Sequence, residues 1–141
     1  MNDHVDVALA AGAEGVHLGQ KDLPVAVVRR LASAELIIGA STNNAGEAQR
    51  GQADGADYVS VGRLYETESK TDTRPASTDT IRAVKAVVSV PVSAIGGINE
   101  SNIDQVIAAG ADMVAVISAV CSAPDPADAA RTLSRRFVDG R

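Results

Sequence analysis

Three segments of this chain repeat one pattern, an Ala-rich helix end followed by a glycine and a short apolar run. They are residues 9–16, 52–59 and 107–114, with glycines at positions 12, 55 and 110. A glycine in this place is typical of a helix C-terminus, because it adopts the left-handed conformation without steric cost. A short run of β-branched residues is typical of a buried strand. The repeat therefore predicts a helix that leads into a buried strand three times.

The segments between the repeats continue the same alternation. Further strands are expected at residues 36–40 and 91–95, and helices at residues 24–34, 44–53, 77–88, 99–109 and 125–137. The expected N-caps are Asn44, Ser77 or Thr78, Asn99 and the cluster Pro124–Pro126, since Asn, Ser, Thr and Asp are preferred there. An initial helix followed by five strand–helix units predicts an α/β fold with a parallel sheet.

Two closures of such a sheet fit the alternation, a doubly wound open sheet and part of a (β/α)8 TIM barrel. No Gly-x-Gly-x-x-Gly motif follows the first expected strand, which disfavours a dinucleotide-binding fold. In both closures ligands meet the carboxyl ends of the strands. The residues that directly follow each strand are therefore the informative ones.

Composition narrows the classes of function. The 141 residues suit one domain, and the scarcity of aromatic residues leaves Val, Ile, Leu and Ala to fill the core. A net charge of −5 without a basic cluster argues against a nucleic-acid partner. No apolar run approaches the ~20 residues that cross a bilayer, and no signal peptide is visible, so we expect a cytoplasmic protein without a membrane partner. Cys121, the single cysteine, is expected to pack as a small apolar residue rather than to act as a nucleophile.

The loop at residues 62–73 follows a buried strand and contains Lys70. The lysine lies among the aliphatic hydroxyls of Thr67, Ser69, Thr71 and Thr73. A cation with several hydroxyl donors at the carboxyl end of a strand favours an anionic, phosphate-bearing ligand. A solvated polar loop is the alternative interpretation.

Two later loops add possible anion donors. Gly96 and Gly97 precede a helix and let backbone N–H groups approach a phosphate, although a tight strand–helix turn would also use them. Residues 117–119 open another short turn after the last strand, and paired loops of this kind often hold phosphate in TIM barrels.

Asp3 and Asp22 are the acids best placed to serve a metal. Asp22 follows the first strand, and Asp3 lies where a preceding strand would end. Two carboxylates with phosphate oxygens and water would suit Mg²⁺, although each aspartate alone is a good helix cap. His17 lies within the first strand and is expected to pack inside a barrel rather than to act as a base.

Together these loops resemble the thiamine-phosphate synthase family, whose members are TIM barrels. The matching segments are Asn2-Asp3, residues 15–22, residues 39–41, residues 67–70, residues 95–98 and residues 117–119. The resemblance implies a transferase that joins hydroxymethylpyrimidine diphosphate to a thiazole phosphate and releases pyrophosphate. It also implies Mg²⁺ held by Asp3 and Asp22, which with Lys70 would neutralise the departing pyrophosphate as the carbon–oxygen bond ionises.

The resemblance implies further roles for single residues. Asn2, Ser41 and Lys70 would contact the diphosphate, with Lys70 and Ser41 as the catalytic residues. The thiazole phosphate would be bound by Thr67, Glu68, Ser69, Gly97, Ile117 and Ser118. The sequence departs from the family pattern at Arg63 and Glu66, where the family usually has prolines.

A second departure is the missing front of the barrel, because only five strands are legible. We therefore expect residues 1–141 to form one partial TIM-barrel domain that lacks the first strands. The unpaired sheet edges predict self-association or a complementing chain. Two alternatives to the synthase are a thiazole tautomerase of the same superfamily and an inactive fragment that binds phosphate ligands. The residues Thr42-Asn43 and the Gln20–Asp22 loop disfavour the tautomerase.

Overall fold

The computed structural model describes residues 1–67 and 73–140. Within them, five parallel strands form one sheet in the order β1-β2-β3-β4-β5. The strands are β1 (Gly15–Leu18), β2 (Ile37–Thr42), β3 (Tyr58–Val61), β4 (Val92–Ile95) and β5 (Met113–Ala115). The three inner strands thus pair with the strands before and after them in sequence, and β1 and β5 are the outer strands.

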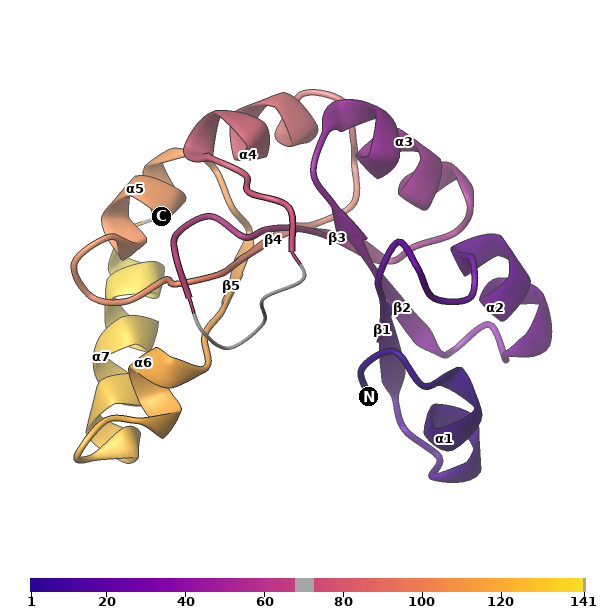
Figure 1. Cartoon of the computed structure of the whole chain (residues 1–141), viewed down its shortest axis with the longest axis horizontal. Coiled ribbons are helices and arrows are strands. Elements are labelled where there is room, and N and C mark those ends of the chain that lie inside the picture. Colours follow the sequence, from indigo (N-terminus) through magenta and orange to yellow (C-terminus); the bar gives the residue numbers. More distant parts are fainter. Residues whose placement is uncertain (68–72, 141) are drawn as a thin grey trace.

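Helices separate the strands. They are α1 (Val5–Ala10), α2 (Val25–Leu31), α3 (Ala45–Ala53), α4 (Thr78–Lys85), α5 (Ile103–Ala108), α6 (Ser118–Cys121) and α7 (Pro126–Asp139). Figure 1 shows the helices along the outside of an arch, with the strands beneath them. A sequential strand order with helices on the outer side is the arrangement of a (β/α)8 barrel, whereas a doubly wound sheet reverses its order and carries helices on both faces. The chain is therefore part of a barrel, and the doubly wound alternative is excluded.

Alternating side chains give the sheet two different faces. Toward the helices it presents buried apolar residues such as Val16, Ile38 and Val59. On the other face the strand register aligns small and polar residues in rows: His17, Gly39 and Tyr58 form one, and Ser41, Ser60 and Ser93 form the next. The period of two along each strand produces this division.

The repeated glycines perform the expected task. Gly12, Gly55 and Gly110 have φ values of 63°, 99° and 91°, in the left-handed region that favours glycine. Each follows a helix C-terminus and precedes a strand. The repeat therefore marks three helix-to-strand junctions, as predicted.

Most helix starts are where the sequence places them. The side chains of Asn44, Ser77 and Asp125 accept hydrogen bonds from the backbone N–H three residues further along. Asn99 is an incorrect prediction: α5 begins at Ile103 with Asn102 as its N-cap. The Asn99 carboxamide oxygen instead accepts hydrogen bonds from the backbone and hydroxyl of Ser101, which turns the chain before the helix begins.

A second correction concerns Cys121. This thiol lies in the short helix α6 and is exposed rather than packed in the core, because α6 contributes no buried residue. Among the described residues, no helix has the length and apolar character needed to cross a bilayer.

Candidate functional site

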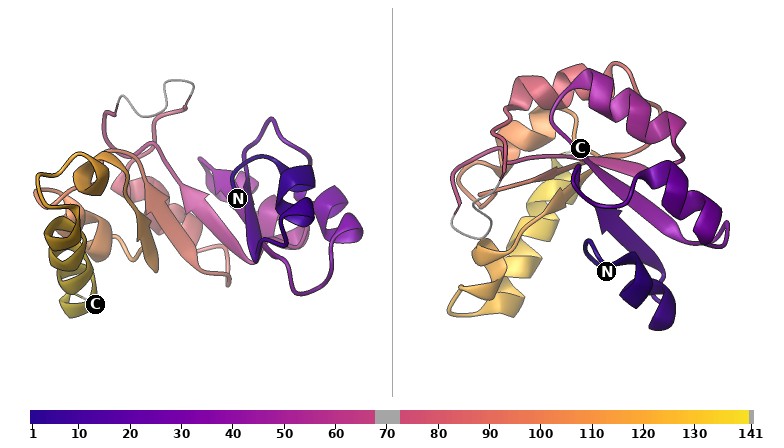
Figure 2. Two further views of the ribbon diagram at one scale, coloured as in Figure 1. Left: turned by 90° about the horizontal axis from the view of Figure 1, so that it is seen from below. Right: turned by 45° about the vertical axis from the view of Figure 1, so that its right-hand side comes forward.

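The loops that follow the strands gather at the carboxyl edge of the sheet. Figure 2 shows the arms of the loop between β3 and α4 projecting beyond the sheet. The N-terminal residues reach the same edge, since the His17 N–H donates to the Met1 carbonyl and the Asp3 N–H donates to the His17 carbonyl, both at 2.9 Å. Asp3 therefore lies beside the end of β1, as the sequence predicts for the end of a preceding strand. Its backbone has a φ of 63°, a conformation that aspartate tolerates better than most residues.

Asp22 lies in the loop after β1 and folds back on it. Its carboxylate accepts a hydrogen bond from the Gly19 N–H at 2.6 Å, and its own N–H donates to the Gly19 carbonyl at 3.2 Å. It also lines a cavity of about 160 Å³ with Gln20, Glu47 and Arg50. Neither Asp22 nor Asp3 caps a helix, because the N-caps of α2 and α1 are Pro24 and His4. The helix-cap interpretation of both aspartates is thereby excluded.

These two carboxylates would fit a hard cation that takes its other ligands from a substrate. Among the described residues, no group of three or more His, Cys, Asp or Glu side chains gathers as a metal centre. A site with two carboxylates is incomplete for a metal held by protein alone. Binding of Mg²⁺, which keeps water and takes phosphate oxygens as ligands, therefore stays a prediction for Asp3 and Asp22.

Ser41 belongs to a chain of hydrogen bonds on the inner face of the sheet. The His17 Nε2 lies 2.9 Å from the Ser41 hydroxyl, and the His17 Nδ1 lies 2.9 Å from the Tyr58 hydroxyl. Burial raises the pKa of the Tyr58 phenol, so this group stays protonated and can donate to Nδ1. In the tautomer of His17 that carries its proton on Nε2, this N–H would donate to Ser41, and the Ser41 hydroxyl proton would be available for an anionic ligand.

His17 is a packed, half-buried residue, as predicted. Its contact with Ser41 was not foreseen from the sequence. The signal that could have revealed it is the strand register, which places His17 beside Gly39, two residues before Ser41. Gln20 adds a further contact by donating from its side-chain amide to the Ser41 carbonyl at 2.6 Å.

A cavity of about 340 Å³ lies at the other side of the carboxyl edge. Its lining residues are Glu66, Thr67, Gly97, Ile98, Asn99, Ser118 and Ala119. Thr67, Gly97 and Ser118 are three of the residues predicted for the thiazole phosphate, and the structure brings them together. Glu66 and Asn99 were not predicted to line a site, and Glu66 adds a carboxylate to the wall. Ile117, also predicted there, is exposed and is the N-cap of α6 rather than a lining residue.

Close backbone approach explains the glycine in this cavity. Gly97 has a φ of 65°, and a Cβ atom on it would lie 2.6 Å from the Glu66 carbonyl oxygen and 2.9 Å from the Tyr65 Cβ. The loop arm that carries Glu66 and Thr67 is held there, because the N–H groups of Leu64 and Tyr65 donate to the carbonyls of Ile95 and Gly96. The wall of the cavity therefore depends on the end of β4.

The other predicted residues are placed as follows. Asn2 is exposed and bridges to His17 at the sheet edge. Glu68, Ser69 and Lys70 lie outside the described residues, so their predicted roles stay predictions.

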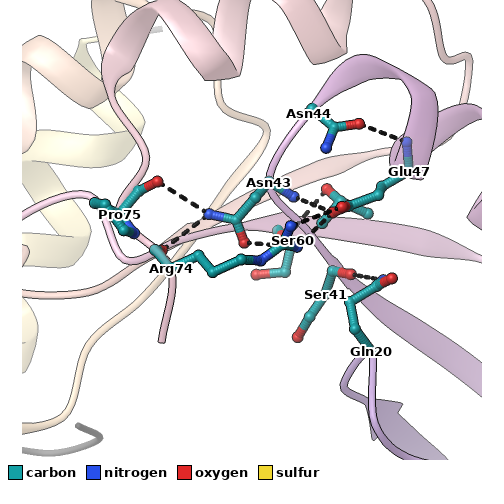
Figure 3. A network of polar contacts seen from close by, with 9 residues as sticks. Gln20, Ser41, Asn43, Asn44, Glu47, Ser60, Arg74 and Pro75 are labelled. Atoms are coloured by element: carbon teal, nitrogen blue, oxygen red, sulfur yellow. Dashed lines mark hydrogen bonds and ion pairs between the residues drawn. The ribbon is translucent and has the colours of Figure 1, made fainter. Parts of the chain in front are cut away.

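A polar network that the sequence did not predict joins the loop after β2 to the loop after β3 (Figure 3). The Arg74 guanidinium donates to both carboxylate oxygens of Glu47, at 2.8 and 2.7 Å, and the Asn43 N–H donates to the same carboxylate at 2.8 Å. The Asn43 side-chain amide donates to the carbonyls of Arg74 and Pro75. Arg74 holds the pKa of Glu47 down at about 2, and Glu47 in turn raises the pKa of Arg74. We call Asn43, Glu47, Arg74 and Pro75 the Glu47–Arg74 network.

Comparison with known proteins identifies the family. The family model described as thiamine monophosphate synthase matches residues 1–120. This chain belongs to that family. A thiamine-phosphate synthase of Moorella thermoacetica is 49% identical over 134 residues, which are 94% of this chain and 64% of the relative. A thiamine biosynthesis bifunctional protein ThiM/ThiE of Symbiobacterium thermophilum is 52% identical over 134 residues, which are 94% of this chain and 28% of the relative.

The fold agrees with this membership. A solved thiamine phosphate pyrophosphorylase of Pyrococcus furiosus superposes with a TM-score of 0.87 at 39% identity, over 99% of this chain and 66% of that one. A solved 3-hexulose-6-phosphate synthase gives a TM-score of 0.68 at 26% identity, over 93% of this chain and 65% of that one. This chain of the thiamine monophosphate synthase family thus spans less than two thirds of the length of these relatives.

Proposed function

We propose that this chain forms the larger part of a thiamine-phosphate synthase, which couples hydroxymethylpyrimidine diphosphate to a thiazole phosphate and releases pyrophosphate. The observation that carries the proposal is the 340 Å³ cavity, in which Thr67, Gly97 and Ser118 meet from two loops and the first turn of α6. These residues are the ones that the family pattern assigns to the thiazole phosphate. Similarity to curated synthases over 94% of this chain supports the same activity.

The cavity suits a phosphate group through its donors. Thr67 and Ser118 offer hydroxyl groups, and the left-handed backbone of Gly97 leaves no side chain between its peptide and a ligand. In our proposal these groups bind the thiazole phosphate and hold the thiazole nitrogen toward the neighbouring loops of β1 and β2. Fixing both reactants in one geometry removes much of the entropic barrier to their coupling.

The diphosphate would lie at the ends of β1 and β2. The contact of His17 Nε2 with the Ser41 hydroxyl fixes the position of this hydroxyl, and in the tautomer protonated at Nε2 the Ser41 proton would be donated to a diphosphate oxygen. Asn2 lies at the same edge, and Lys70 would add a positive charge from the β3–α4 loop. Asp3 and Asp22 would hold Mg²⁺, which when bound neutralises charge on the leaving pyrophosphate.

An assay with both substrates and Mg²⁺ tests the proposal. We expect thiamine phosphate as product, and we expect Asp22→Asn and Lys70→Ala to lower kcat by about 100-fold or more, because they remove charges that stabilise the transition state. Asp139→Asn is the control, since this exposed carboxylate lies at the far end of α7 and should leave activity unchanged.

Two results would contradict this assignment. One is wild-type turnover without thiamine phosphate, which is what a tautomerase would give. The other is thiamine phosphate formation that the Asp22 and Lys70 variants leave intact.

A further inference from the structure

We propose that Glu47 is a positioning residue that fixes the wall of the phosphate cavity from a distance, through its paired contact with Arg74. This inference rests on the proposed function only for the identity of the ligand. The Glu47–Arg74 network itself joins α3 to the loop that carries Glu66 and Thr67 (Figure 3).

Glu47 is itself rigidly held before it meets Arg74. It lies in the first turn of α3, where its N–H donates to the Asn44 side chain at 2.9 Å. Its carboxylate accepts the Asn43 N–H, and only 10% of its side chain is exposed, whereas 54% of the Arg74 side chain is exposed. The glutamate is therefore the fixed partner, and the arginine is the one that it immobilises.

Backbone hydrogen bonds connect Arg74 to the wall of the cavity. The Arg63 N–H donates to the Arg74 carbonyl at 3.1 Å, and the Ala76 N–H donates to the Arg63 carbonyl at 2.7 Å. The two arms of the loop are thus tied together at their base. The outgoing arm continues from Arg63 through Tyr65, whose N–H donates to Gly96, to Glu66 and Thr67 in the wall.

None of the residues in the Glu47–Arg74 network lines the 340 Å³ cavity, so the network cannot act by touching a phosphate bound there, although Glu47 also lines the 160 Å³ cavity beside Asp22. It also differs from a surface ion pair within one helix. Arg82 and Asp79 are three residues apart in α4, both more than half exposed, and joined by one contact. Because both residues lie in α4, this pair connects no other segment to the helix, and it provides a matched control.

The experiment measures amide hydrogen exchange and inorganic phosphate binding in the whole chain, with turnover as a separate readout. Glu47→Gln keeps the size of the side chain and removes its charge. We expect exchange of the Arg63 and Ala76 amides to accelerate about tenfold, as for the loss of one charge-assisted contact. We expect phosphate to bind about tenfold more weakly at Gly97 and Ser118, and KM for the thiazole phosphate to rise more than kcat falls.

Two further variants make the result specific. Arg74→Lys keeps the charge but loses the two-pronged geometry, so it should give an intermediate effect on both readouts. Asp79→Asn should change neither. Unaltered exchange at the buried Val59 amide shows in each case that the sheet remains folded.

The possible outcomes separate this inference from the proposed function. Unchanged exchange at Arg63 and Ala76 in Glu47→Gln overturns the inference, because the network then holds nothing. Faster exchange with unchanged phosphate affinity also overturns it, because the position of the segment from Arg63 to Thr67 then does not determine how the cavity binds phosphate. A wild-type chain that makes no thiamine phosphate contradicts the proposed function alone, since exchange and phosphate binding still test the network.

Discussion

At the scale of single residues, Gly39 decides the shape of the inner face. A Cβ atom on Gly39 would meet the ring and hydroxyl of Tyr58, and would lie 2.5 Å from the His17 Nδ1. The glycine is thus required by its neighbours, because it leaves room for the pair of rings that hold Ser41. Any side chain at this position would separate Tyr58 from His17.

We therefore expect Gly39→Ala to lower the free energy of unfolding by about 1 to 3 kcal/mol, the usual effect of overpacking. Urea unfolding measures this loss. Gly46→Ala is the matched control, since a Cβ there makes only ordinary contacts of 3.4 and 3.6 Å and alanine is the better residue in a helix. Equal stability of the Gly39 variant and the wild type would show that the two rings do not need this space.

The types of residue in the sequence predicted some members of the candidate site but not the contacts that orient them. Thr67, Gly97 and Ser118 were indicated by their positions, because hydroxyls and glycines after parallel strands favour an anion site, whereas Ser41 was indicated by the resemblance to the synthase family. The sequence could not indicate that His17 orients Ser41, since that contact depends on the register between β1 and β2. It could not indicate that Ile117 would be the exposed N-cap of the short helix α6, and the predicted role of Ile117 stays a prediction.

At the scale of elements, helix starts were predictable where one side chain alone makes the cap. Asn44, Ser77 and Asp125 each bind a backbone N–H within their own turn. The prediction of Asn99 as an N-cap was wrong, because its side chain accepts a hydrogen bond from the Ser101 N–H instead. The Glu47–Arg74 pair was not predictable, because its partners lie 27 residues apart and meet only through the path of the loop after β3.

The same pair gives a pH dependence. The pKa of Glu47 is lowered from 4.5 to about 2 in the folded chain, so its contribution to stability is complete above pH 4.5. That contribution is lost as the pH falls from 4.5 toward 2, because protonation is easier in the unfolded chain. Since Arg74 is more than half exposed, we expect only about 1 kcal/mol after solvent screening.

The difference between the wild type and Glu47→Gln isolates this effect from the other carboxylates. Urea unfolding gives the free energy of unfolding of both chains at each pH between 5.5 and 2.5. We expect the two free energies to converge as the pH falls. A difference in the free energy of unfolding that stays constant over this pH range would mean that the ion pair adds nothing to stability.

At the scale of the whole molecule, the sheet has two edges. Within the described residues, β5 pairs only with β4. The outer side of β1 carries only the isolated bridge between Asn2 and His17. The alternation of helices and strands predicted a parallel sheet but could not exclude a doubly wound one, and the partial barrel was predicted from the resemblance to the synthase family. Strand order, which the alternation does not encode, excluded the doubly wound sheet.

Open parallel edges favour association of the 141-residue chain. We expect its mass in sedimentation velocity to rise with concentration. Met113→Lys, at an exposed position of the β5 edge, should reduce this association, whereas Val138→Lys on α7 should not. A monomer at all concentrations that unfolds cooperatively would contradict the expectation.

The sequential strand order has a consequence for biosynthesis. Because each strand pairs with its immediate neighbour along the chain, the sheet grows in the direction in which a ribosome delivers it. Each strand from β2 onward meets the edge of the strand that precedes it along the chain, so these four pairings need no distant partner. The nascent polypeptide can therefore gain structure one helix–strand unit at a time, well before its last residue is added.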